Sequence, residues 1–157
     1  MVFDGLTNFE LVELAKQNNI KLGLDDVIMM DEVTKLTKNK NYNLIVNLQQ
    51  TGQGGSHWIC LMIRKNKWLV IDSFGAYPHP IIVKKCIKDK NSLAYSAYIC
   101  QDLKSKRCGY YALQCIKQLQ HSDETNLYEN ANTYVNEYVP ETNINEKIVM
   151  LGMKTKP

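Results

Sequence analysis

Helical spacing of apolar residues appears first near the start of the chain. Thr7 and Glu10 have the spacing of a capping box, and the apolar stripe that follows predicts a helix from about residue 8 to about residue 17. The next segment, residues 20–33, has apolar residues interrupted by a glycine and two aspartates. We expect it to be an irregular segment that packs on the core.

A nearly continuous apolar run, WICLMI at residues 58–63, predicts a strand that is covered on both faces. A polar turn at 64–67 and a second apolar run, WLVI at 68–71, follow it. These runs predict a β-hairpin in the middle of a sheet. The hairpin begins at His57 and ends at Asp72.

The second half of the chain predicts further helices and one strand. Apolar residues with lysines between them predict a helix from Ile81 to near Asn91, and LAYSAYIC at 93–100 has the composition of a strand. Apolar spacings of three and four predict a helix that starts at Cys108, and residues 143–153 predict a last short helix. The fold class is therefore α+β.

Composition limits the class of protein. The 157 residues, 45% of them hydrophobic, fit a single domain over 1–157. A net charge of +3 gives no general field for DNA or an anionic membrane, so only a local basic patch could bind nucleic acid. The start of the chain lacks the features of a secretory signal, and no apolar run approaches the roughly 18 residues of a membrane span. We expect a soluble protein from a reducing compartment, with no membrane contact.

The cysteines are odd in number and lie mostly inside apolar runs, so we expect no disulfide framework. The five are Cys60, Cys86, Cys100, Cys108 and Cys115.

Cys108 combines two features that favour a reactive thiolate, namely a predicted helix N-terminus and a partner histidine. Gly109, which follows it, is expected to leave room for a substrate beside the sulfur. Among the three histidines, His57 stands between a flexible glycine-rich loop and a buried strand, where a rigid scaffold can aim a side chain into a cleft. His79 and His121 are more typical of surface positions.

Two further residues complete a candidate catalytic set. If the hairpin strands pair antiparallel, Asp72 lies beside His57 and can fix its tautomer, although capping of the following loop is an alternative role. Gln101 is a candidate to donate its amide hydrogens to the oxyanion of a tetrahedral intermediate, together with the N–H of Cys108. A surface position is the alternative for this glutamine.

The loop TGQGGS at 51–56 lacks the Gly-Lys-Ser/Thr ending of a phosphate-binding loop. It would instead let a substrate backbone lie close to His57, with Gly54 and Gly55 as substrate contacts. Trp58 either covers this cleft or belongs to the core.

The order His57, Asp72, Gln101, Cys108, within the pieces GGSHW, IDSFG and CGYYALQ, resembles adenovirus-type (adenain-like) cysteine proteases and the related Ulp1-type peptidases. The resemblance covers about residues 43–120. It implies a central mixed sheet flanked by helices, papain-like with rearranged chain order, and a Cys-His-Asp triad with a glutamine oxyanion hole. FELVELAKQNNI and VIMMDEV also look like the leading segment of proteases encoded by virophages, polintons and large DNA viruses.

The resemblance implies a maturation endopeptidase that cuts viral capsid or core precursor proteins after small residues, often glycine. Its location would be the host cytoplasm or viral factory, with packaging in the virion. Asp72 replaces the glutamate of the adenoviral branch and matches the Ulp1-type branch, so a deconjugase for a ubiquitin-like protein stays open.

No cofactor is expected to be required. The cysteine that links the activating peptide of the adenoviral enzyme is not matched, because Lys90 stands at the equivalent distance. The modest net charge does not favour activation by DNA, although several basic residues could form a patch. These are Lys84, Lys85, Lys88, Lys90, Lys104, Lys106 and Arg107.

Two other classes remain as alternatives. A zinc-binding module could draw on His57 and the cysteines, but no pair has the C-x2-C spacing of a zinc knuckle, and Cys60 and Cys115 are expected in the core. We therefore predict no metal site. A catalytically inactive binding module of the same fold is the other alternative, and the presence of all four candidate groups argues against it.

Overall fold

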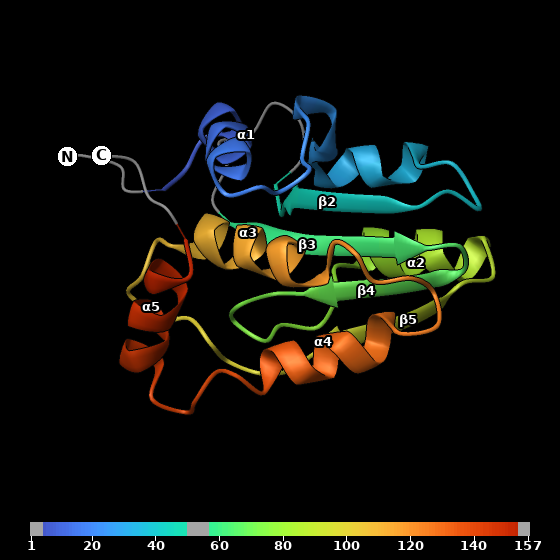
Figure 1. Cartoon of the computed structure of the whole chain (residues 1–157). Helices are drawn as coiled ribbons and strands as arrows, with labels where there is room; N and C mark the ends of the chain where they lie inside the picture. The colour runs from blue at the N-terminus through green and yellow to red at the C-terminus, as the bar shows by residue number, and fades with distance from the viewer. Residues whose placement is uncertain (1–4, 50–56, 154–157) are drawn as a thin grey trace.

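The computed structural model describes residues 5–49 and 57–153. Over these residues it has the predicted α+β fold, with one mixed five-stranded sheet between helices (Figure 1). The spatial order of the strands follows the chain. The strands are β1 (Val27–Met29), β2 (Tyr42–Asn47), β3 (Trp58–Arg64), β4 (Lys67–Ile71) and β5 (Ser92–Ser96).

The predicted hairpin is confirmed as β3 and β4, which pair antiparallel. Its turn is shorter than predicted. Arg64 pairs with Lys67, so the turn consists of Lys65 and Asn66 rather than residues 64–67. Lys65 has a φ of 54°, the left-handed conformation that two-residue hairpin turns commonly need. The turn was predicted too long because Arg64 and Lys67 are polar, but a charged side chain does not prevent its backbone from pairing.

The two outer strands pair in parallel with their neighbours, β1 with β2 and β5 with β4. The segment 20–33, predicted to be irregular, contains β1, which was missed because three half-buried residues show no alternation. β5 ends at Ser96, before the predicted end at Cys100. The chain leaves the sheet there, and the N–H of Cys100 donates instead to the carbonyl of Ser73 at 2.8 Å.

Helices cover both faces of the sheet (Figure 1). α1, α3 and α4 pack on one face, with α5 against α3, whereas α2 and the 3-10 helix η2 pack on the other. Thr7 and Glu10 form the predicted capping box of α1. The helices are α1 (Asn8–Gln17), η1 (Leu24–Asp26), η2 (Met30–Lys35), α2 (Pro80–Lys88), α3 (Cys108–Leu119), α4 (Leu127–Val135) and α5 (Thr142–Leu151).

The side chains of β3 alternate between two apolar cores. Cys60 and Met62 face α1 and α3, while Ile59 and Leu61 face α2. Cys115 is fully buried on α3, so the expectation that Cys60 and Cys115 are core residues is confirmed. Within 5–49 and 57–153, no helix is both long and apolar enough to cross a bilayer.

A buried arginine ties the hairpin to the end of α3. Arg64 is 5% exposed, and its guanidinium donates to the carbonyls of Ser122 at 2.6 Å and Gln120 at 3.2 Å and to the side chain of Asn43 at 2.7 Å. Burial lowers the pKa of Arg64. Carbonyl dipoles therefore hold this cation in place, and they fix the position of α3 against β3.

Candidate active site

The hairpin places His57 and Asp72 in contact. His57 directly precedes β3, Asp72 directly follows β4, and the register of the strands makes the two positions diagonal neighbours. Nε2 of His57 lies 2.7 Å from Oδ1 of Asp72, and the two side chains are 11% and 6% exposed. The predicted proximity of these residues is confirmed.

A tight turn after β4 orients the carboxylate of Asp72. Oδ1 of Asp72 also accepts the N–H of Phe74 at 2.8 Å, so the aspartate caps the loop as well as contacting the histidine. Gly75 closes the turn with a φ of 69°, and its N–H donates to the carbonyl of Asp72 at 2.8 Å. The Phe74 ring stacks on His57 with centroids 4.8 Å apart. The imidazole of His57 is therefore held by Phe74 against one face of its ring and by Asp72 at Nε2.

The surroundings of His57 favour its protonated form. Burial by itself would lower the pKa of the imidazole, but hydrogen bonds to Asp72 and Cys108 and the negative charges of both groups outweigh burial and raise the pKa of His57 from 6.5 to about 9. Because Nε2 is bonded to Asp72, the nitrogen left for Cys108 is Nδ1. The site is built to hold a cation between two acceptors.

Cys108 is the first residue of α3, where the N–H groups of the first turn have no partner inside the helix. This end of a helix favours negative charge. The backbone N–H of Trp58 also points at the sulfur, with N and Sγ 3.5 Å apart. Cys108 is 6% exposed and lines the adjoining cavity.

Gln101 forms part of the wall of that cavity and is fixed on both sides of its amide. Its Oε1 accepts the hydroxyl of Ser73 at 2.5 Å, and its Nε2 donates to the carbonyl of Ser105 at 2.9 Å. The contact from Nε2 to Oγ of Ser105 is longer, at 3.4 Å. Gln101 is 1% exposed, so it is not the surface residue of the alternative interpretation. One amide hydrogen is only weakly engaged.

The cavity beside His57, Gln101 and Cys108 has a volume of about 650 Å³. His57, Gln101 and Cys108 line it, and its other walls come from the segment before α1, from β1, and from the loop before α3. Trp58 also lines it, while its ring packs against the core and its indole N–H donates to the carbonyl of Leu6 at 2.8 Å. The two roles predicted as alternatives for Trp58 are both seen.

Three glycines were predicted to contact the substrate. Gly54 and Gly55 lie outside the described residues. Gly109 is not among the described residues that line the cavity. A Cβ at Gly109 would lie 3.1 Å from side-chain atoms of both Leu6 and Leu11. Gly109 therefore gives α1 and the segment before it room to pack closely on α3, and its place beside the substrate stays a prediction.

Several residues that shape the site gave little signal in the sequence. Ser73, which anchors Gln101, and Phe74, which stacks on His57, both lie in the piece IDSFG that drew attention only to its aspartate. Ser105 holds the other side of the Gln101 amide, and only its place in the polar loop before the nucleophile could have suggested it. Serine and phenylalanine have no role that spacing alone could assign.

The remaining histidines and cysteines have structural positions. Nδ1 of His79 accepts the N–H of Ile81 at 3.1 Å and so caps α2, and His121 is exposed just after α3. All five cysteines are free. In the part of the chain that the structure describes, no three histidine, cysteine or acidic side chains are grouped so that they could hold a metal ion.

No protein-family model matches the sequence, and no curated protein matches it significantly. Among solved structures, the chain is similar to the crystal structure of the ASFV pS273R protease, with a TM-score of 0.57 and 14% sequence identity over 97% of this chain and 68% of that one. A selenomethionine form of that protease aligns with a TM-score of 0.40 and 16% identity over 85% and 67% of the two chains. At this identity the first likeness shows the fold, which this chain shares with a protease.

Proposed function

We propose that the protein is a cysteine endopeptidase with Cys108 as nucleophile, His57 as general acid and base, Asp72 as the group that orients His57, and Gln101 as an oxyanion donor. The observation that supports this most is the chain of contacts from Asp72 through His57 to Cys108 at the start of a helix. The shared fold with the ASFV protease adds support that is independent of these side chains.

The proposed reaction begins when the thiolate of Cys108 attacks the carbonyl carbon of the scissile peptide bond. A C–S bond forms, and the carbonyl π electrons move to the oxygen, which Gln101 and the Cys108 N–H stabilise. Protonated His57 gives its proton to the leaving nitrogen as the C–N bond breaks, which leaves a thioester. Neutral His57 then takes a proton from water as that water attacks, and cleavage of the C–S bond returns the thiolate.

The proposed substrates are viral precursor proteins of the capsid or core, cut after a small residue such as glycine. The sequence resemblance to adenovirus-type enzymes supports this choice. On the same ground we propose action in the host cytoplasm or viral factory and packaging in the virion. We also propose that no cofactor is required, because the cysteine that links the activating peptide of the adenoviral enzyme is not matched and the modest net charge does not favour activation by DNA. The alternative function is that of a deconjugase for ubiquitin-like proteins. The substrate test must separate it from a maturation protease.

The test incubates the protein with precursor polypeptides and with ubiquitin-like conjugates, beside a Cys108→Ala control. Cleavage of precursors alone that needs Cys108 supports the maturation protease. Cleavage of conjugates alone overturns the proposed substrate but keeps the peptidase. Cleavage of neither, or cleavage that persists in the control, overturns the peptidase.

Selective alkylation provides a test that needs no substrate. Burial raises the pKa of Cys86 to about 11 and of Cys100 to about 12, and it raises the pKa of Cys115 well above its ordinary value. Cys60 is fully buried. Iodoacetamide should therefore label Cys108 first, and a His57→Gln substitution should slow that labelling. Equal labelling of all five thiols would contradict an activated thiolate.

A further inference from the structure

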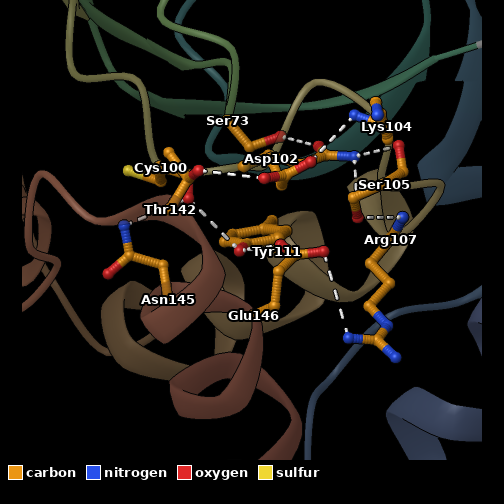
Figure 2. Close-up of polar contacts among 11 residues, drawn as sticks. Ser73, Cys100, Asp102, Lys104, Ser105, Arg107, Tyr111, Thr142, Asn145 and Glu146 are labelled. Carbon is orange, nitrogen blue, oxygen red and sulfur yellow. Dashed lines mark hydrogen bonds and ion pairs between the residues drawn. The ribbon is translucent and has the colours of Figure 1, made fainter.

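The loop from Cys100 to Arg107 carries Gln101 and leads to Cys108, and α5 contacts it near both ends (Figure 2). Asn145 on α5 is completely buried. Its Nδ2 donates to the carbonyl of Cys100 at 3.1 Å, the residue that adjoins Gln101. The same amide exchanges two hydrogen bonds with the backbone of Val139, at 2.6 and 2.8 Å. Asn145 is therefore locked in place while it holds the start of the loop.

Glu146, the next residue of α5, reaches the other end of the loop. One carboxylate oxygen accepts the hydroxyl of Tyr111 on α3, and the other lies 3.9 Å from the guanidinium of Arg107. Burial and the nearby Glu146 carboxylate raise the pKa of Tyr111, so its hydroxyl keeps the proton that it donates. Arg107 directly precedes Cys108. Glu146 thus connects α5 to the residue before the sulfur and to the helix that carries it.

Thr142, the first residue of α5, adds a third contact. Its hydroxyl donates to Oδ2 of Asp102 at 3.2 Å, while Oδ1 of Asp102 accepts the N–H of Lys104 at 3.0 Å (Figure 2). The loop has no strand or helix of its own between Cys100 and Cys108. Its conformation therefore depends on contacts such as these.

We propose that α5 is a positioning element, which through Asn145, Glu146 and Thr142 sets the Gln101 amide relative to the sulfur of Cys108. This inference rests on the proposed peptidase function, because it concerns the geometry of the oxyanion donors. A donor that moves by about 1 Å loses about a hundredfold in rate in preorganised sites. None of the three residues lines the cavity, so they act through the loop and not on the substrate.

The test compares Asn145→Ala with Val149→Ala, which removes a fully buried core side chain from the same helix without removing a hydrogen bond to the loop. Hydrolysis of a fluorogenic peptide with glycine before the scissile bond gives kcat and KM. The matching peptide aldehyde reports the oxyanion site, because attack of the sulfur on its carbonyl carbon puts negative charge on the aldehyde oxygen. The rate of alkylation by iodoacetamide reports the reactivity of the Cys108 thiolate alone, because that reaction forms no oxyanion.

In Asn145→Ala we expect kcat and aldehyde affinity to fall together by about tenfold to a hundredfold, while KM and the alkylation rate stay close to wild type. Val149→Ala should lower the Tm by about as much as Asn145→Ala does. It should leave kcat, KM, aldehyde affinity and the alkylation rate unchanged when both variants are measured well below their Tm. If Asn145→Ala loses Tm but keeps kcat and aldehyde affinity, α5 has only a structural role and the proposal is wrong.

Two milder variants keep the proposal testable if Asn145→Ala does not fold. Glu146→Gln retains an acceptor for Tyr111 and removes only the charge that faces Arg107, and Thr142→Val keeps the shape of the side chain. Each should lower kcat and aldehyde affinity severalfold without a change in the alkylation rate, and unchanged values in both would overturn the proposal. A wild-type protein that cleaves no peptide would overturn the peptidase proposal and, with it, this inference.

Discussion

Replacement of Asp72 by asparagine should lower the pKa of His57. The introduced amide would keep the size of the side chain and an acceptor for the N–H of Phe74, but it would lose the charge that lies 2.7 Å from Nε2 of His57. Burial of the ring, which lowers its pKa, and the contact with Cys108, which raises it, would both remain. We therefore expect the pKa of His57 to fall clearly below the wild-type value of about 9.

The size of this effect follows from the shift itself. A change from 6.5 to about 9 corresponds to about 3 kcal/mol in favour of protonated His57. Since this pKa is raised in the folded protein, the stabilisation is fully present below about pH 6.5 and is lost as the pH rises through about 9. Near neutral pH the protonated fraction of His57 should therefore be lower in the variant than in the wild type.

The assay follows the imidazole C–H signals of the histidines by NMR across this pH range, with His57→Gln used to assign the His57 signal. Urea unfolding adds a second measurement, because Asp72→Asn should cost up to about 3 kcal/mol at pH 6 and clearly less at pH 10. The kcat for peptide hydrolysis should fall by about 10²–10⁴-fold. If His57 titrates with the same midpoint in both proteins, Asp72 does not hold the proton, and its proposed role is refuted.

Three further substitutions test how the site is supported. Ser73→Ala removes the hydroxyl bonded to Gln101 at 2.5 Å, and kcat should fall about tenfold with little change in KM; an unchanged kcat would show that Gln101 needs no such anchor. Gly75→Ala places a Cβ 2.6 Å from the carbonyl oxygen of Ala97 at a φ of 69°, so urea unfolding should show a loss of about 2 kcal/mol or more, and a neutral result would contradict the tight packing of this turn. Arg64→Met leaves buried carbonyls without donors and should lower the free energy of unfolding by about 3 kcal/mol, whereas a gain in stability would mean that the cation is not needed.

Local patterns were sufficient for much of the fold. The capping box of α1 and the apolar stripe of α3 are set by residues within a few positions of one another, so these helices could be predicted. The β3–β4 hairpin could be predicted because two apolar runs flank a short polar turn, and it brought His57 and Asp72 together. β1 could not, because its three residues become a strand only through pairing with β2.

The supports of the site depend on contacts between distant parts of the chain. Nothing near Gln101 in the sequence indicates that Ser73 bonds its amide, and nothing near Gly109 indicates that Leu6 and Leu11 fill the space beside it. Such contacts exist only after the sheet and helices have packed. Sequence therefore predicted the candidate catalytic groups but not the residues that hold them in place.

Trp58 shows why the candidate site needs the whole fold. Its backbone N–H donates to the sulfur of Cys108, its indole N–H donates to the carbonyl of Leu6, and it directly follows His57. Trp58 belongs to the hairpin that carries His57, and it contacts both Cys108 on α3 and the segment before α1. Because these three segments are far apart in the sequence, the distance between His57 and Cys108 is set only when β3 packs on α3 and the segment before α1 packs against both. The geometry that would make the thiol reactive is therefore a property of the folded protein and not of any single motif.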